Sequence, residues 1–208
     1  MSNPSPWPLI HAERKALLDD LQAIPDQRWD TPSLCQQWTV RQVLGHMTAT
    51  AKMTPPRFIG HFVASGFRFD TMVNKDLTKE IAGTPADLLA RFAEQLNATG
   101  HPPGPVEAML GEAIIHSEDI RRPLGIKHTY PTEALIRVAD FFKGSNLLIG
   151  AKKRIAGLGL HATDADWSSG SGPEVSGPLL SLVLAITGRI AALDDLYGAG
   201  MARLRSRD

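Results

Sequence analysis

Apolar residues recur at three- and four-residue intervals along much of the chain, which is the spacing of amphipathic helices. Such stretches cover residues 8–24, 39–51, 57–80 with a break near Gly66, 84–100, 110–125 and 131–156 with a break near Gly144. Thr39 and Thr84 are typical helix N-caps, and Pro55-Pro56 is expected to break the second helix. Four long helices with apolar stripes predict a helical bundle.

The pattern changes after residue 156. Leu158, Leu160 and Ala162 alternate with smaller or polar residues, which is typical of a strand. Residues 174–176 are expected to be the return strand of a small hairpin, and 168–173 its turn. Residues 178–187 and 190–205 return to a helical pattern. We therefore predict a mainly α fold, with a bundle in residues 1–130 and a small α/β extension in 131–208 packed on the bundle.

The helix predicted over 110–125 has an unusual polar face. At about 100° per residue, Glu112, His116 and Asp119 fall within roughly 60° of one another. Isoleucines cover much of the remaining circumference. A helix that is apolar on most sides is normally buried. A lone buried charge is costly, so ionisable groups on such a helix must be paired or bound to a metal.

A catalytic zinc site commonly has three protein ligands and one open position. Glu112 and His116 supply two ligands, and His46, at the edge of the apolar stripe of the second helix, is the best third candidate. Nickel, iron and manganese remain open. Asp119 would orient His116 or pair with a neighbouring arginine. The alternative interpretation is that His46 is a core histidine and Glu112 pairs with an arginine.

Bulk composition narrows the function classes. Lys plus Arg and Asp plus Glu both number 22, so the formal net charge is zero and nothing favours a nucleic-acid partner. No uninterrupted apolar stretch approaches 18 residues, so no membrane span is expected. The single cysteine, Cys35, and the absence of a signal-peptide pattern at the start predict a cytoplasmic protein. Monomer and homodimer both remain open.

Several segments resemble the mycothiol-dependent maleylpyruvate isomerase family, within the superfamily of DinB-like four-helix bundles. The matching segments span nearly the whole chain. They are residues 32–41, Gly45-His46, 112–125, 162–167, 170–175, 187–189 and 193–198.

The resemblance implies a divalent metal, usually zinc, held by His46, Glu112 and His116. It also implies the use of the low-molecular-weight thiol mycothiol in an actinobacterial cytoplasm. Two departures are visible. Gln36-Gln37 stands where such sequences often have Pro-Gly, and the chain is expected to lack the additional sterol-carrier-like domain of the isomerase. These departures favour a relative with another electrophilic substrate.

Further residues receive expected roles. Arg68 and Asn74 are candidates to line the cofactor pocket, and a solvated helix face is the alternative for both. Arg121 and Arg122 are candidates to hold a substrate carboxylate, and ion pairing within the helix is the alternative. Cys35 is interpreted as a small buried hydrophobic residue, because the thiol nucleophile would come from the cofactor.

The leading hypothesis is a metal-dependent transferase or isomerase that uses a thiol as nucleophile. Metal coordination deprotonates a thiol, which gives a nucleophile at neutral pH. Its partners would be the small-molecule thiol and an electrophilic substrate. Two other functions remain: a non-catalytic bundle that binds a metal or a small ligand, and a metal hydrolase in which bound water replaces the thiol.

Overall fold

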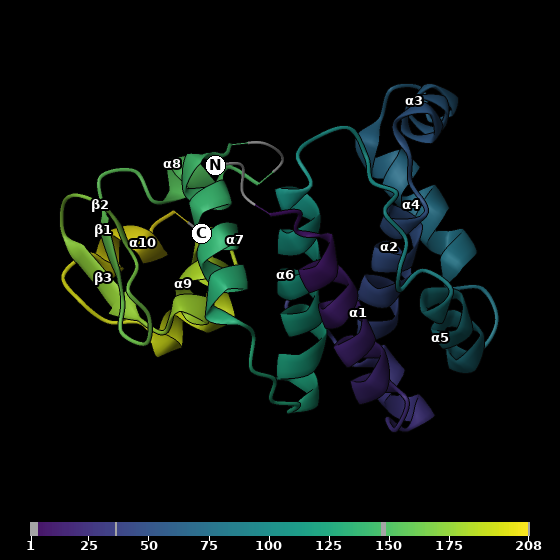
Figure 1. Cartoon of the computed structure of the whole chain (residues 1–208), viewed down its shortest axis with the longest axis horizontal. Helices are drawn as coiled ribbons and strands as arrows, with labels where there is room; N and C mark the ends of the chain where they lie inside the picture. Colours follow the sequence, from purple (N-terminus) through teal and green to yellow (C-terminus); the bar gives the residue numbers. More distant parts are fainter. Residues whose placement is uncertain (1–3, 36, 147–148, 208) are drawn as a thin grey trace. The chain divides into compact units, whose positions relative to one another are not determined.

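The chain divides into two compact units. The computed structural model describes residues 4–35, 37–146 and 149–207. The first unit ends at His128 and the second begins at Thr129. In Figure 1 the first unit runs from purple to teal and the second from green to yellow. Each unit is described by itself below.

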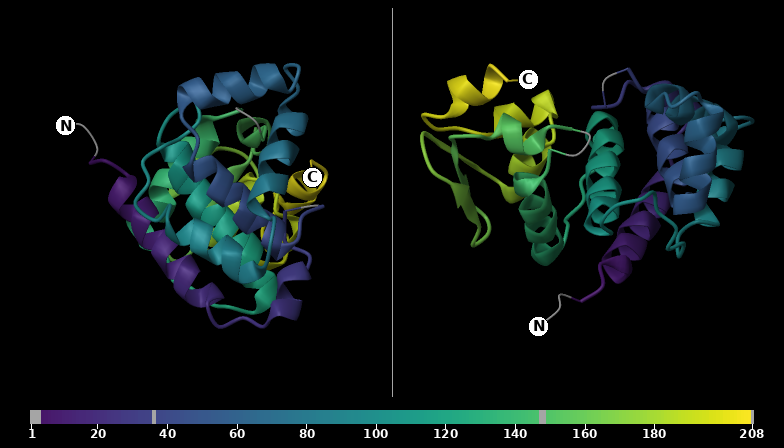
Figure 2. Two further views of the ribbon diagram at one scale, coloured as in Figure 1. Left: turned by 90° about the vertical axis from the view of Figure 1, so that its right-hand side faces the viewer. Right: turned by 90° about the horizontal axis from the view of Figure 1, so that it is seen from above.

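The first unit is a bundle of four helices. These are α1 (Trp7–Leu21), α2 (Val40–Ala51), α5 (Pro85–Ala93) and α6 (Glu107–Leu124). Helix α1 packs on α5 and α6, and α2 packs on the same two helices, which closes the bundle. Figures 1 and 2 show α1 and α6 side by side. A short 3-10 helix, η1 (Asp26–Asp30), lies between α1 and α2 and contacts α2.

Helices α3 (Pro55–Ala64) and α4 (Phe69–Glu80) connect α2 to α5. Gly66, in the left-handed region at φ 64°, lies between α3 and α4, as predicted. The expectation for Pro55-Pro56 was incomplete, because these prolines begin α3 behind the N-cap Thr54. Proline is well suited to the first helical turn, where its missing N–H would have no partner. Helix α5 ends at Ala93, earlier than the predicted Gly100.

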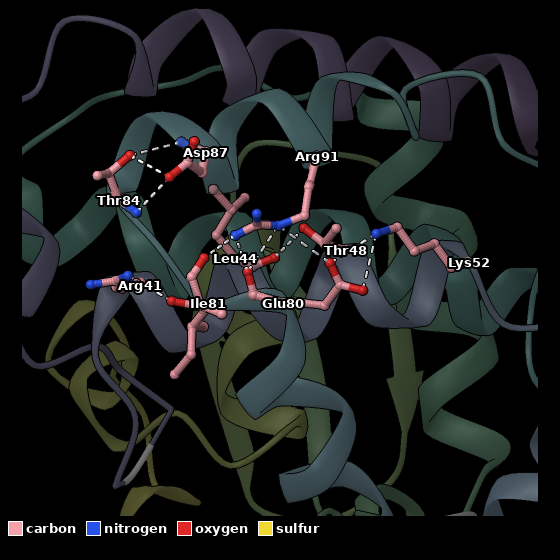
Figure 3. Close-up of polar contacts among 10 residues, drawn as sticks. Arg41, Leu44, Thr48, Lys52, Glu80, Ile81, Thr84, Asp87 and Arg91 are labelled. Carbon is pink, nitrogen blue, oxygen red and sulfur yellow. Dashed lines mark hydrogen bonds and ion pairs between the residues drawn. The ribbon is translucent and has the colours of Figure 1, made fainter.

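Polar contacts hold the corner between α4 and α5 against α2 (Figure 3). Arg41 of α2 donates to the carbonyl oxygen of Ile81 at 2.6 Å. Lys52, after the end of α2, forms an ion pair with Glu80 at 2.8 Å, and Arg91 donates to the carbonyl oxygen of Glu80. These contacts satisfy carbonyl groups at the end of α4. They also fix the helix that carries His46.

The core of the first unit fills the space between the helices. Leu17 and Leu21 of α1, Val43 and Leu44 of α2 and Phe92 of α5 are all fully buried. Ile120 of α6 belongs to the same cluster. The stripes predicted from the helical periodicity therefore form this core. Because packed apolar side chains are costly to displace, the core gives α2 and α6 a fixed relative position.

The second unit combines short helices with a small sheet. Its helices are α7 (Thr132–Gly144), α8 (Ala151–Arg154), α9 (Leu179–Ile186), the 3-10 helix η2 (Ile190–Asp195) and α10 (Met201–Arg205). Its strands are β1 (Gly159–Ala162), β2 (Ser168–Gly170) and β3 (Glu174–Gly177). Helix α9 packs on α7 and on the strands. The strands gather at one edge of this unit (Figure 2).

The predicted hairpin is wrong in its pairing. Residues 168–170, predicted as turn, form β2 and pair with β1 antiparallel. The predicted return strand, β3, pairs with β1 in parallel, so β1 is the central strand. Alternation identifies a strand but not its partner, which is why the sequence left the topology open. The single helix predicted over 190–205 is instead η2 and the separate short helix α10.

The mainly helical fold class is confirmed, and the three-stranded sheet supplies the small β component. Among the described residues, no helix has both the length and the hydropathy that a membrane crossing requires. Two sequence expectations of local structure are also confirmed in detail. Thr39 caps α2 in a reciprocal arrangement with Gln42, and Gly125 ends α6 at φ 72°.

The loop before α2 contains a backbone conformation that favours glycine. Gln37 lies at φ 73°, in the left-handed region. A side chain with a Cβ is strained there, and glycine is not. We expect Gln37→Gly to raise the free energy of unfolding by up to about 1 kcal/mol. Gln22→Gly, at φ −61° after α1, is the matched control and should lower it by about 0.5–1 kcal/mol. Urea unfolding measures both changes, and equal signs would contradict this interpretation.

Candidate metal centre

Helix α6 carries three of the predicted site residues on one face. Its isoleucines Ile114, Ile115 and Ile120 are buried, as the pattern predicted. Glu112 and His116 are partly buried, and Asp119 is fully buried. The polar face therefore points into the first unit. An interior position raises the free-energy cost of every charge on this face that has no partner.

Two histidines from different helices meet at this face. The ring centroids of His46 and His116 lie 5.1 Å apart in an edge-to-face arrangement. The ring of Trp38, just before α2, contacts both rings. Its centroid lies 4.9 Å from that of His46 and 6.5 Å from that of His116. Burial, and then the nearby His116, lower the pKa of His46 to about 3. His46 is therefore a neutral imidazole at pH 7, the form that binds metals.

Asp119 orients His116. The Nδ1 atom of His116 lies 2.8 Å from Oδ2 of Asp119. A carboxylate only accepts hydrogen bonds, so Nδ1 carries a proton in this pair, and in the neutral tautomer the lone pair would be on Nε2. Metal-binding histidines usually donate their second ring N–H in this way. The geometry fits the orienting role predicted for Asp119.

Glu112 is a buried carboxylate without a hydrogen-bond partner. Both of its oxygens are inaccessible and accept no hydrogen bond. Burial raises the pKa of Glu112, and the charges of Arg14 and His116 oppose that rise. Arg14 donates two hydrogen bonds to the carbonyl oxygens of Gln95 and Ala98 rather than to Glu112. A buried acceptor left unsatisfied is costly, so this carboxylate lacks a cation or a donor.

One compact group of candidate donor atoms stands out. Among the described residues, Cys35, His116 and Asp119 are the only three whose ligand atoms all lie within 4.8 Å of one another. His46 and Glu112 are not in this group, although each interacts with His116. The structure thus places three predicted residues, His46, Glu112 and Asp119, next to His116. The specific metal set of His46, Glu112 and His116 stays a prediction.

The two predicted catalytic arginines are engaged in ion pairs. Arg121 is fully buried, and its Nε donates to Asp20 of α1 at 2.7 Å. Arg122 is half-buried and donates to Glu118, one turn earlier in α6, at 3.1 Å. Arg122 thus forms the pair within the helix that was its alternative, whereas Arg121 pairs with a residue of another helix. Their role toward a substrate carboxylate stays a prediction.

The two predicted cofactor-binding residues lie at α4. Arg68 is the N-cap residue of this helix, and Asn74 is in its middle. Both are exposed. Asn74 lines a shallow surface hollow with Thr71, Lys75, Thr78 and Lys79. In the described chain no hydrogen bond, ion pair or ring contact joins either residue to His116. Their role in binding a cofactor therefore stays a prediction.

Sequence reasoning missed the position of Cys35 and the contacts of Trp38. Cys35 was interpreted as a small buried hydrophobic residue and Trp38 received no functional role, yet one belongs to the donor group and the other contacts both imidazoles. Both lie about 80 residues from His116 in sequence, so no local periodicity links them. Their only signal is the motif over 32–41, which precedes the helix of His46.

Comparisons with known proteins agree with the sequence resemblance. Residues 10–100 match the family model of the mycothiol maleylpyruvate isomerase N-terminal domain. Two similar solved structures are the crystal structure of the mycothiol-dependent maleylpyruvate isomerase, with a TM-score of 0.65, and that of a histidine-to-alanine mutant, with 0.64. Each is 16% identical to this chain and is matched over 93% of this chain and 91% of its own. No curated protein matches the chain in sequence.

These comparisons correct one expectation. The chain was expected to lack an additional domain of the isomerase, yet the likeness covers 91% of the solved isomerase chain. The second unit takes part in that likeness, because 93% of this chain is matched. At 16% identity the likeness shows the fold.

Proposed function

We propose that this chain, whose residues 10–100 match the family model of the mycothiol maleylpyruvate isomerase N-terminal domain, is a metal-dependent enzyme that uses a low-molecular-weight thiol. The thiol would be mycothiol, as in the name of the matched family. The reaction would be the transfer of that thiol to an electrophilic carbon, or an isomerisation that passes through such an adduct. The compartment would be the cytoplasm, where thiols stay reduced.

One observation carries the proposal. Glu112 presents two buried oxygens that accept no hydrogen bond, one helical turn from His116. A divalent cation between them would satisfy the carboxylate and bind Nε2 of neutral His116. The donor types present suit a metal, and His46, Glu112 and His116 would hold it. Such a metal would supply a thiolate at neutral pH, because coordination deprotonates a bound thiol.

The surrounding residues have defined tasks in this proposal. Asp119 holds the proton on Nδ1 of His116 and so keeps Nε2 available. The ring of Trp38 contacts both imidazoles and would help to hold them in place. His46 stays neutral because burial disfavours its charged form. Together they preorganise nitrogen donors before any ligand arrives.

Metal content and turnover test the proposal. Purified protein should bind about one zinc ion per chain. It should then consume mycothiol in the presence of an electrophile such as maleylpyruvate. Omission of the thiol is the control, because a metal hydrolase would still turn over a suitable substrate. Protein that binds no divalent metal under any loading condition would refute the proposal.

A further inference from the structure

The sulfur of Cys35 lies in the donor group of the candidate centre. Its Sγ atom and the ligand atoms of His116 and Asp119 all lie within 4.8 Å of one another. Cys35 is partly buried, and it is the only cysteine of the chain. The group combines a sulfur, a nitrogen and an oxygen donor, which is a set that zinc and cobalt accept.

The loop that carries Cys35 is fixed to the helix that carries His116. The backbone N–H of Leu34 donates to the carbonyl oxygen of Asp119 at 3.1 Å. The hydroxyl of Ser33 accepts from the N–H of Cys35 at 3.1 Å and donates to its carbonyl oxygen at 3.0 Å. The N–H of Ser33 donates to the carbonyl oxygen of Trp38. These hydrogen bonds therefore hold the backbone around Cys35 against α6, the helix that carries His116.

A second observation points to a cation beside His116. The buried carboxylate of Glu112 accepts no hydrogen bond and lies one helical turn from His116. A divalent cation there would stabilise a thiolate form of Cys35, because a coordinated thiol is deprotonated.

We propose that Cys35 is a sulfur ligand of the metal that His116 binds. This inference rests on the proposed function, since it needs that metal. A catalytic centre leaves one position open for the reacting group. With Cys35 bound, the chain's own thiol closes that position until an external thiol replaces it. In that exchange Cys35 takes up the proton of the incoming thiol, so neither the charge nor the number of electrons changes.

Cobalt substitution tests the inference without any turnover. Cobalt(II) bound to a thiolate shows a sulfur-to-metal charge-transfer absorption in the near ultraviolet. We expect this absorption in the full-length protein loaded with cobalt in thiol-free buffer. Cys35→Ser should lose it and still bind about one cobalt ion per chain. Gln37→Gly, a change in the same loop that keeps the sulfur, is the matched control and should retain the absorption.

X-ray absorption of the zinc-loaded wild-type protein gives a second readout that needs no variant. It should show one sulfur at about 2.3 Å from zinc. This measurement decides the matter if Cys35→Ser and Cys35→Ala both fail to fold by circular dichroism. Cobalt bound without the absorption, or zinc without a sulfur neighbour, would overturn the ligand role of Cys35 and leave the proposed function standing. Protein that binds neither metal would overturn both.

Discussion

We expect His116→Ala and His46→Ala to lose metal binding and thiol-dependent turnover while the bundle stays folded. The centroids of the two rings lie 5.1 Å apart, and the rings would supply the nitrogen donors of the proposed centre. Removal of either ligand should weaken zinc binding by more than about 100-fold, since even loss of an orienting partner costs 10–100-fold. The core formed by Val43, Leu44 and Ile120 does not depend on either ring. Zinc titration, turnover and thermal unfolding should be measured on each variant.

Two further variants sharpen this test. Glu112→Gln should lose less metal affinity, because an amide oxygen still coordinates weakly. His161→Ala, at an exposed position in β1, is the matched control and should bind zinc as the wild type does. If His46 is instead a core histidine, His46→Ala should lower the melting temperature and spare the metal. Histidine variants that keep full zinc and full turnover would show that the ligand assignment is wrong.

We expect Arg121→Ala to destabilise the first unit far more than Arg122→Ala. Arg121 is fully buried and pairs with Asp20, and its charge also counteracts the burial-raised pKa of Glu13. Loss of one partner of a buried pair costs about 3–5 kcal/mol, and we expect about 3 because Asp20 is partly exposed. Arg122 is half-buried and pairs within one helix, so its loss should cost less than about 1 kcal/mol. Urea unfolding measures both.

The same pair of variants separates a structural role from a catalytic one. If an arginine holds a substrate carboxylate, its alanine variant should lose turnover, chiefly through a raised KM, with its fold intact. Arg121→Ala with unchanged stability and strongly reduced turnover would reject the structural interpretation. Arg122→Ala with unchanged turnover would reject a catalytic role and agree with a structural one, such as its ion pair with Glu118.

Much of the helical architecture could be predicted because its signals are local. Thr39 and Thr84 cap their helices through contacts three residues away, and Gly125 ends α6 through its own backbone conformation. The apolar periodicity identified the faces that form the core. Predictions failed where one local signal has two meanings. Pro55-Pro56 was expected to break a helix but begins α3, and residues 168–170 form a strand where the composition indicated a turn.

By itself, the sequence determined which residues share the polar face of α6. Helical geometry places Glu112, His116 and Asp119 together whatever surrounds the helix. Only the tertiary structure brought Cys35 to His116, paired Arg121 with Asp20 and left Glu112 without a hydrogen-bond partner. The first two relations join residues that are distant along the chain. The third arises because no other helix or loop in the described part of the chain supplies a hydrogen-bond donor to Glu112. They are set by how whole helices and loops pack, and residue spacing carries no information about that packing.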